Sequence, residues 1–346
     1  MLYLQKISFN IFPHEDFPPG RAPEDPAAGV AERDGNAAGA KEFHDGYIRR
    51  FPLFLIHFPR EKPGRMNTYL ECIPCFLKQA LFAAREATDD EATIKRVLDT
   101  VASHIPDIPL DSPPPYSARF VYGAIREITG AKDPFRDLKA ESIQTALHHY
   151  KKMKALVENS CDPLRTAARI AIAGNVIDFG SHQHFDLEKE MKEALENPLS
   201  IDHYESFKRN IENARTVLYL GDNAGETVFD RILIETIGKN TIYAVRDVPI
   251  INDATVEDAQ KSGIDSVARI ISSGCDAPGT ILQRCSKEFL DIYRNADVIL
   301  SKGQGNLECL SNAQEPIFFL LKVKCAVIVR SLGAPNGGMI LKDARL

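Results

Sequence analysis

Residues 221–226 (GDNAGE) place a carboxylate, Asp222, and an amide, Asn223, side by side after a short apolar run. Carboxylate and amide oxygens are hard ligands that suit Mg²⁺ or Mn²⁺. The glycines of the segment permit a tight turn, and the backbone N–H groups of a following helix could bind a phosphate. Glu226 ends the segment and is a further candidate substrate contact. Alternatively, Asp222 or Asn223 only caps the helix.

Asp253 is a second candidate ligand, within residues 246–255 (RDVPIINDAT), which follow the next apolar run. In open α/β sheets, ligands bind outside the carboxyl ends of the strands. We therefore expect Asp253 to face Asp222 across two neighbouring strand ends. The alternative is again a helix cap, because Asp253 stands where the next helix would start.

A lysine and two glycines follow a later apolar run, in the segment SKGQGNLE. The ammonium of Lys302, with the backbone amides exposed at Gly303 and Gly305, would form a phosphate cradle, and Asn306 adds a polar side chain. The segment is not a P-loop, because the spacing GxxxxGK[ST] is absent. The alternative is a flexible loop with a solvated lysine.

Asn175 and Asp178 lie in residues 174–180 (GNVIDFG), at the end of the last long predicted helix. Their polar side chains, separated by apolar residues, could reach into a cleft between the helical part of the chain and the sheet. There they would contact substrate. The competing interpretation is a simple helix C-cap at Gly174.

Cys72 and Cys75 form a single CxxC pair at the start of a predicted helix. The spacing suits a second metal or a redox dithiol. A zinc site normally needs four protein ligands, and the sequence has no second CxxC. The alternative is a capped helix start with buried thiols. The other five cysteines are scattered along the chain, so we expect free thiols and no disulfide scaffold.

Composition excludes several classes of protein. The chain has 346 residues with a net charge of −6, whereas a nucleic-acid-binding surface usually shows a basic excess. No apolar run approaches the roughly 18 residues that suggest a membrane helix. The N-terminus lacks the basic start and long apolar centre of a signal peptide. We expect a cytoplasmic protein that binds neither nucleic acid nor membrane.

The elements that position these candidates divide the chain into three parts. Residues 1–65 are rich in Pro, Gly, Ala and charge, which predicts disorder, as a start-site extension or as a flexible tail. Residues 66–213 show helical spacing, with Asp133 and Asp162 as N-caps ahead of proline. This predicts an all-helical region.

Residues 214–346 alternate short apolar runs with helical stretches. Such continuous apolar strands predict a parallel sheet that is covered on both faces. We therefore expect a Rossmann-like α/β/α sandwich with a doubly wound, mainly parallel sheet. The predicted strands are 216–220, 241–245, 266–271, 297–300 and 325–329, with helices over 227–237 and 280–295.

The segments GDNAGE, NDAT, SKGQGNLE and GNVID together resemble the damage-control phosphatase family. That family was long catalogued as a domain of unknown function, and one branch was once described as acidic-residue methyltransferases. The segments MNTYLECIPCFLKQA and KVKCAVIV resemble its cysteine-containing prokaryotic branch. The resemblance covers about residues 66–338.

The resemblance implies a helical N-terminal region packed on an α/β/α sandwich. It also implies a divalent metal (Mn²⁺, Mg²⁺, Co²⁺ or Ni²⁺) held by Asp222, Asn223 and Asp253, and hydrolysis of small phosphorylated metabolites. Lys302 falls where the family places a phosphate-contacting lysine. The RTxK segment of another branch is missing, so that branch's substrate contacts are not transferred to this chain.

These observations predict a metal-dependent phosphomonoester hydrolase. The metal would bind a phosphate oxygen, while Lys302 and loop amides would stabilise the other oxygens. Asp222 is a ligand or also the attacking carboxylate, and Asp253 or Asp178 would position a water if it is not a ligand. Two alternatives are an S-adenosylmethionine-dependent carboxyl methyltransferase and a non-catalytic metal or redox module centred on Cys72 and Cys75.

Overall fold

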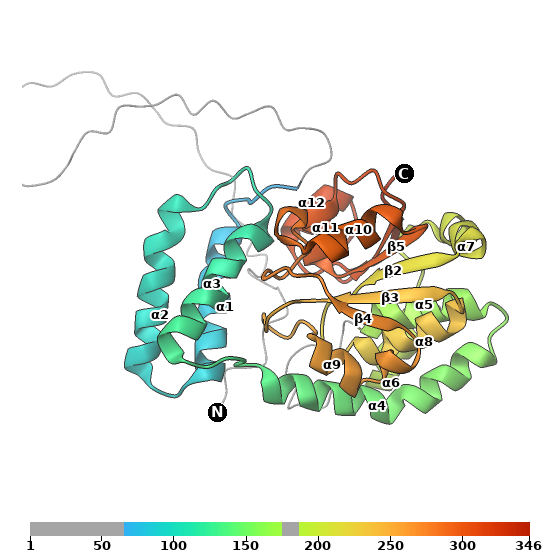
Figure 1. Cartoon of the computed structure of the whole chain (residues 1–346), viewed down its shortest axis with the longest axis horizontal. Helices are drawn as coiled ribbons and strands as arrows, with labels where there is room; N and C mark the ends of the chain where they lie inside the picture. Colours follow the sequence, from blue (N-terminus) through green and yellow to red (C-terminus); the bar gives the residue numbers. More distant parts are fainter. Residues whose placement is uncertain (1–65, 175–186) are drawn as a thin grey trace, which may run out of the picture. The chain divides into compact units, whose positions relative to one another are not determined.

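The computed structural model describes residues 66–174 and 187–346 (Figure 1). The described residues all belong to one compact unit. The segment 1–65, together with the candidates Asn175 and Asp178, lies outside the described residues.

A seven-stranded sheet forms the centre of this unit, in the order β1-β7-β6-β5-β2-β3-β4. Neighbouring strands are parallel except for β6 and β7, which are antiparallel. This confirms the prediction of an α/β fold with a mainly parallel sheet. The strands are β1 (Ile201–Asp202), β2 (Thr216–Leu220), β3 (Asn240–Val245), β4 (Arg269–Ser272), β5 (Val298–Lys302), β6 (Ile317–Lys322) and β7 (Met339–Asp343).

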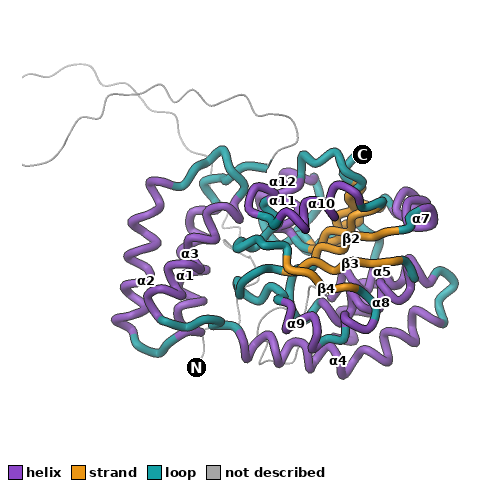
Figure 2. The backbone as a smooth tube through the Cα atoms, viewed as in Figure 1, coloured by secondary structure: helices purple, strands orange, loops and turns teal. Residues whose placement is uncertain are grey.

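Helices cover both faces of the sheet, whose strands lie between them in Figure 2. Side chains alternate along each strand, so Val217 and Tyr219 of β2 join one hydrophobic core while Leu218 and Leu220 join another. This is why the strands are apolar throughout. The first face carries α4 (Arg136–Glu158), α5 (Pro163–Ala173), α6 (Leu187–Glu196), α7 (Tyr204–Asn213), α8 (Thr227–Ile237) and α9 (Val256–Lys261). The second face carries α10 (Lys287–Asn295), α11 (Gln304–Leu310) and α12 (Ala326–Leu332).

The first three helices form a third core: α1 (Cys72–Ala87), α2 (Glu91–His104) and α3 (Pro114–Thr129). Ile250, from the loop after β3, is buried in this core. Arg126 of α3 also donates a hydrogen bond to the carbonyl of Pro249 (3.0 Å). The helical layer therefore holds the loop that carries Asp253. The domain boundary at residue 213 stays a prediction, because α4 and α5 share a core with the sheet.

Two predictions about the later elements were wrong. The apolar run 325–329, predicted as a strand, begins α12, and the strands β6 and β7 were not predicted. The short strand β1 was not predicted either, and it interrupts the region 66–213 that was predicted to be all-helical. A short buried apolar run does not distinguish strand from helix, because either can be covered on all sides. The helix predicted over 280–295 is also shorter, since α10 begins only at Lys287.

Two N-cap predictions had opposite outcomes. Asp162 caps α5 as predicted, with its side chain accepting a hydrogen bond from the Arg165 N–H (3.1 Å). Asp133 does not cap α4, because its side chain accepts from the Phe135 N–H and pairs with Lys139 (2.8 Å). In the described part of the chain, no helix is long and apolar enough to cross a membrane.

Candidate active site

The candidate residues meet where the strand order reverses. From β2 the chain moves outward through β3 to β4, and it returns to the other side of β2 with β5. Such a switch point leaves a crevice at the carboxyl ends of the two central strands. Asp222 follows β2 and Gly303 follows β5. A Cβ atom on Gly303 would lie 1.9 Å from Asp222 Oδ2, so glycine lets the second loop come directly against the carboxylate.

The helix-cap alternatives do not hold for Asp222, Asn223 or Asp253. The N-cap position of α8 is Glu226, and no side chain makes a cap hydrogen bond there. The N-cap of α9 is Thr255, which forms a capping box with Asp258. The three candidate ligands are therefore not used to cap these helices.

Backbone hydrogen bonds join the loops that follow β2 and β3. The Ala254 N–H donates to the Asp222 carbonyl (2.7 Å), and Asn223 pairs with Asp253 as an isolated antiparallel bridge. Asp253 itself is held by its own N–H, which donates to the Ile250 carbonyl (2.9 Å). The structure thus brings together Asp222, Asn223 and Asp253, as the strand-end argument predicted.

Arg246 links these carboxylates and was missed by the sequence analysis, although it directly follows β3. Its guanidinium donates to Asp253 Oδ2 (2.6 Å) and, at a longer 3.4 Å, to Asp222 Oδ1. It also donates to Asn306 Oδ1 (3.1 Å), which accepts a second hydrogen bond from Thr280 Oγ1 (2.8 Å). We call these five residues the arginine network. The two carboxylates raise the pKa of Arg246 despite its burial.

Asp222 is the least satisfied carboxylate of the arginine network. Burial raises its pKa well above the usual range, and Asp253 and Glu226 add to the rise. Arg246 and Lys324 oppose it but do not reverse it. The side chain of Asp222 keeps 12% of its surface exposed, against 5% for Asp253. The ionised form of Asp222 is therefore only partly neutralised by the protein, and its side chain is partly exposed.

A second buried network lies beside Asn223 and is centred on Lys302. The Lys302 ammonium donates to Glu226 Oε2 (2.8 Å) and Asp230 Oδ1 (2.6 Å). Tyr219 and Tyr243 each donate a hydroxyl hydrogen bond to Asp230 (2.7 Å), which completes the pairing of that carboxylate. We call Lys302, Glu226, Asp230, Tyr219 and Tyr243 the lysine network.

The lysine network orients a candidate ligand. Asn223 Nδ2 donates to Glu226 Oε1 (2.6 Å), and Lys302 holds the other oxygen of that carboxylate. Burial raises the pKa of Glu226, and the Lys302 charge opposes the rise. Lys302 and Glu226 are fully buried, so the structure places neither at a surface that faces substrate. Their predicted phosphate contacts stay predictions.

Lys324, in the loop after β6, is a further basic residue near the site. Its charge lowers the pKa of both Asp222 and Glu226, which places Lys324 in the electrostatic surroundings of both carboxylates. Its backbone N–H donates to Gln304 Oε1 (2.6 Å), and its side chain is partly exposed. The sequence analysis did not single out Lys324, because the strand that precedes it, β6, was not predicted.

The two remaining candidates of the loop after β5, Gly305 and Asn306, are both in close contact with neighbouring backbone. A Cβ atom on Gly305 would lie 1.9 Å from the Pro278 carbonyl oxygen, so a glycine there allows the backbone of α11 to approach that loop. Asn306 is buried and donates to the carbonyls of Lys302 (2.8 Å) and Gly221 (3.3 Å). Both residues therefore position the strand ends.

The charges of the site fit a divalent cation. Four carboxylates of the two networks face two buried cations, Arg246 and Lys302, so the formal charges of these six groups sum to −2. Within residues 66–174 and 187–346, no three His, Cys, Asp or Glu side chains are grouped so as to hold a metal ion. The ligands expected here are two carboxylates and one amide. They could hold a metal only if Arg246 released part of its hold on them.

The CxxC pair lies apart from the two networks. Cys72 and Cys75 begin α1, and both are partly buried free thiols. Burial raises the pKa of Cys72 to about 11 and also raises that of Cys75, which disfavours the thiolate that metals and oxidants require. The absence of a metal-holding group among the described residues applies to this pair too. Its metal or redox role stays a prediction.

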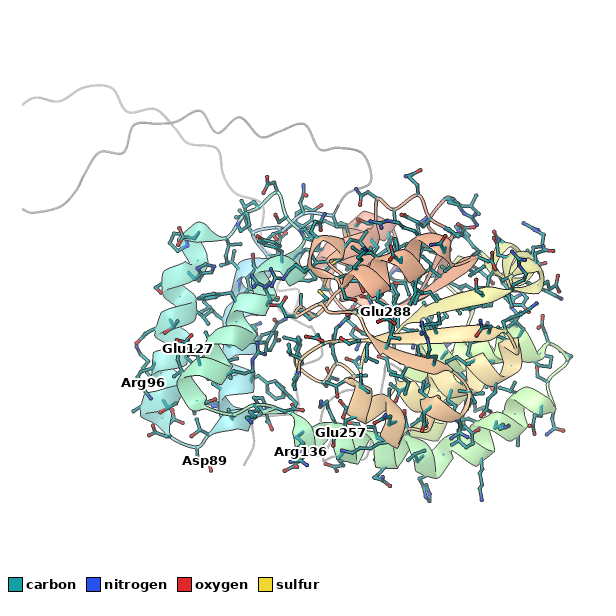
Figure 3. All side chains as sticks on the ribbon, in the orientation of Figure 1. Asp89, Arg96, Glu127, Arg136, Glu257 and Glu288 are labelled. Atoms are coloured by element: carbon teal, nitrogen blue, oxygen red, sulfur yellow. The ribbon has the colours of Figure 1, made fainter. Side chains whose placement is uncertain are left out.

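Several charged side chains elsewhere are exposed, although Lys139 and Asp258 form a further buried ion pair. Glu257 on α9 and Glu288 on α10 point into solvent, as do Asp89 and Arg96 at the helical layer (Figure 3). Charges buried in pairs cost desolvation free energy, so proteins rarely keep them without a structural or chemical use. The two networks combine such buried charges with the carboxyl ends of the central strands, and are therefore the part of the described chain best suited to chemistry.

Comparison with known proteins identifies the family. Residues 68–340 match the sequence profile of the damage-control phosphatase ARMT1-like domain. The chain belongs to this family. A damage-control phosphatase of Pyrococcus horikoshii is 33% identical over 283 residues, which are 80% of this chain and 97% of that protein. A damage-control phosphatase of Archaeoglobus fulgidus is also 33% identical, over 78% of this chain and 97% of its own length.

The fold comparison agrees with the family. The crystal structure of a DUF89 family protein from Pyrococcus horikoshii matches with a TM-score of 0.74 at 32% identity. It covers 81% of this chain and 100% of that protein. The resemblance recognised in the sequence motifs is thereby confirmed, and membership of the family supports a phosphatase role.

Proposed function

We propose that the chain is a metal-dependent phosphatase that hydrolyses small phosphorylated metabolites. Asp222, Asn223 and Asp253 hold one divalent cation in this proposal, which is Mn²⁺, Mg²⁺, Co²⁺ or Ni²⁺. The observation that carries it is the incompletely paired, partly exposed Asp222 carboxylate at the strand-order switch point. A bound cation would neutralise the excess negative charge and polarise a phosphate oxygen.

The protein's own groups would bind and orient the phosphate. Lys324 is the cation that is both near Asp222 and partly exposed, so it is suited to hold phosphate oxygens that the metal does not. Lys302 instead acts through Glu226 on the amide of Asn223, and is a positioning residue. Arg246 fixes the separation of Asp222 and Asp253.

Phosphate release from p-nitrophenyl phosphate tests the proposal. The protein is stripped with a chelator and assayed with each of the four metals. We expect activity only with metal, and a fall on the order of 10²–10³-fold for Asp222→Asn and Asp253→Asn. Asp99→Asn, at an exposed aspartate of α2, is the matched control and should keep full activity. Full activity of Asp222→Asn, or equal activity without metal, would remove the basis of the assignment.

The methyltransferase alternative has less support. It needs the acidic residue after β3 to bind a ribose, whereas the Asp253 carboxylate accepts a 2.6 Å hydrogen bond from Arg246. The two relatives described above are both named as phosphatases. Calorimetric binding of S-adenosylmethionine to the metal-free protein would reverse this preference.

A further inference from the structure

Three arginines gather around one carboxylate where α3 meets the loop after β4. Arg284 donates two hydrogen bonds to Asp276, from Nε to Oδ1 (2.6 Å) and from Nη2 to Oδ2 (2.9 Å). Arg119 of α3 donates to Oδ2 of the same carboxylate (3.3 Å). Arg126, further along α3, forms no ion pair in the described part of the chain, although the charge of Asp276 acts on it. We call Arg119, Arg126 and Arg284 the basic patch.

The basic patch has more hydrogen-bond donors than partners. A guanidinium presents several N–H groups in a planar fork. Arg119 uses one of them on Asp276, and Arg126 uses one on the Pro249 carbonyl (3.0 Å); the others have no acceptor among the described residues. Burial lowers the pKa of Arg126, as expected for a cation that is desolvated without a close counter-charge. The side chains of Arg119 and Arg284 are 32% and 37% exposed, so both are open to a ligand from solvent.

The charge of the basic patch matches a phosphate group. Three guanidiniums and the Asp276 carboxylate sum to a formal charge of +2. Asp247, on the neighbouring loop, accepts a 2.6 Å hydrogen bond from the Ser272 hydroxyl and forms no ion pair with these arginines. A phosphate monoester carries a charge of about −1.5 to −2 at pH 7 and offers three acceptor oxygens. Guanidinium groups bind such oxygens in pairs, with charge-assisted hydrogen bonds.

The helix α3 presents the basic patch to the carboxyl ends of the strands. Arg119, Tyr122 and Arg126 are spaced three and four residues apart, so they lie on one face of the helix. Arg126 binds Pro249, in the loop that carries Asp253, and Arg119 binds the loop after β4. Both loops extend from the sheet toward α3 in Figure 1. Burial raises the pKa of Tyr122, and the charge of Asp253 adds to the rise, which places this face of α3 near the candidate metal ligands.

The loop after β4 also joins the basic patch to the arginine network. Thr280 lies in the same loop as Asp276. It donates a hydrogen bond to Asn306 (2.8 Å) and accepts a longer one from Arg246 (3.5 Å). The basic patch and Asp222 are therefore served by adjoining loops at one edge of the sheet. A ligand with one end at Asp222 can follow these loops to the patch.

We propose that the basic patch binds a second phosphate of the substrate, so that the enzyme acts on small metabolites with two phosphate groups. This inference rests on the proposed function. The phosphate to be removed lies at Asp222, while the second one accepts hydrogen bonds from Arg119 and Arg284 and is attracted by the charge of Arg126. Asp276 competes with this second phosphate, because it accepts from the same guanidinium groups.

Binding of phosphonates, whose C–P bonds resist hydrolysis, tests the patch without reference to activity. Propane-, hexane- and octane-bisphosphonates are titrated calorimetrically into the full-length protein with Mn²⁺, beside hydroxyl-ended monophosphonates of the same lengths. At the chain length that spans the two sites, we expect the bisphosphonate to bind roughly tenfold more tightly. Arg119→Gln should abolish this preference. Asp276→Asn should increase it, whereas a purely structural role of the ion pairs predicts a loss in both variants.

An exposed arginine supplies the matched control. Arg294 lies on α10 with 63% of its side chain exposed, so Arg294→Gln should keep the preference for the bisphosphonate. With the corresponding phosphate esters, the ratio of kcat/KM for the bisphosphate to that for the monophosphate should fall toward one in Arg119→Gln. Circular dichroism of each variant confirms that it is folded.

The outcomes separate this proposal from the proposed function. A bisphosphonate preference that depends on Arg119, in a protein that releases no phosphate with any metal, refutes the proposed function and supports the binding patch. Metal-dependent phosphatase activity with equal binding of both phosphonates at every chain length overturns the patch. Equally tight binding of a carboxylate-ended monophosphonate overturns the assignment to a second phosphate.

Discussion

The arginine network and the lysine network have the same formal charges, but their carboxylates differ in how fully they are paired and hydrogen-bonded. Each contains one buried cation and two carboxylates. In the lysine network, both carboxylates contact the ammonium within 2.8 Å, and the tyrosine hydroxyls and Asn223 supply further hydrogen bonds. In the arginine network, Asp222 has only a 3.4 Å contact and remains partly exposed.

This difference indicates that one network positions the site and that the other presents the group that binds a ligand. A buried ion pair that is fully hydrogen-bonded is rigid and has no capacity for another ligand. A carboxylate that is desolvated but incompletely paired binds an incoming cation well, because the cation supplies the missing charge. The lysine network therefore fixes Asn223, and the arginine network presents Asp222. Substitutions in the two networks should separate stability from activity.

The largest effect is expected for Lys302→Met. This change leaves Glu226 and Asp230 buried without a cation, which should lower the free energy of unfolding by about 3–5 kcal/mol. Urea denaturation followed by circular dichroism measures it. A change below about 0.5 kcal/mol, the size typical of surface substitutions, would show that Lys302 is not the structural cation of the lysine network.

Lys324→Met is the matched substitution on the side of the crevice that we assign to substrate. Because this lysine is partly exposed, its loss should leave stability within about 0.5 kcal/mol. The value of kcat/KM for p-nitrophenyl phosphate should fall roughly tenfold, which corresponds to about 1.4 kcal/mol. Steady-state kinetics on both lysine variants gives the contrast. Unchanged kinetics with lost stability would exchange the roles of the two lysines.

The smallest effect has an unusual sign. Burial raises the pKa of Asp222 in the folded protein. The ionised carboxylate therefore destabilises the folded protein at any pH above the pKa that Asp222 has in the unfolded chain. In a chelator near pH 7, Asp222→Asn should therefore raise the free energy of unfolding, by about 1 kcal/mol. The difference should vanish below about pH 3, where the carboxyl is protonated in both the folded and the unfolded protein. Destabilisation by this variant at neutral pH would mean that Arg246 satisfies Asp222 fully.

Much of this organisation could be predicted from the sequence. The apolar run 216–220 correctly predicted the strand β2, and polar residues at predicted strand ends selected Asp222, Asn223 and Asp253. The basic residues that pair with these carboxylates were harder to predict, because the paired residues are far apart in the sequence. Arg246 and Asp222 are 24 positions apart, and Lys302 and Asp230 are 72 positions apart.

The sequence also did not show which of the polar side chains are buried. Lys302 beside two glycines indicates a solvent-facing phosphate cradle when sequence alone is considered, but the alternation of β5 turns this side chain onto α8. Asp230, inside an apolar helix, gave no signal of its own. The gathering of the basic patch around Asp276 likewise depends on loop packing, which no spacing rule predicts.

Metal binding by the chelator-stripped protein tests the central claim most directly. Isothermal titration with Mn²⁺ should give one site per chain in the wild type. Asp222→Asn should lose this site, whereas a Cys72→Ser, Cys75→Ser double variant should keep it unchanged. Retention of the site in Asp222→Asn together with its loss in the double cysteine variant would contradict the account and place the metal at the start of α1.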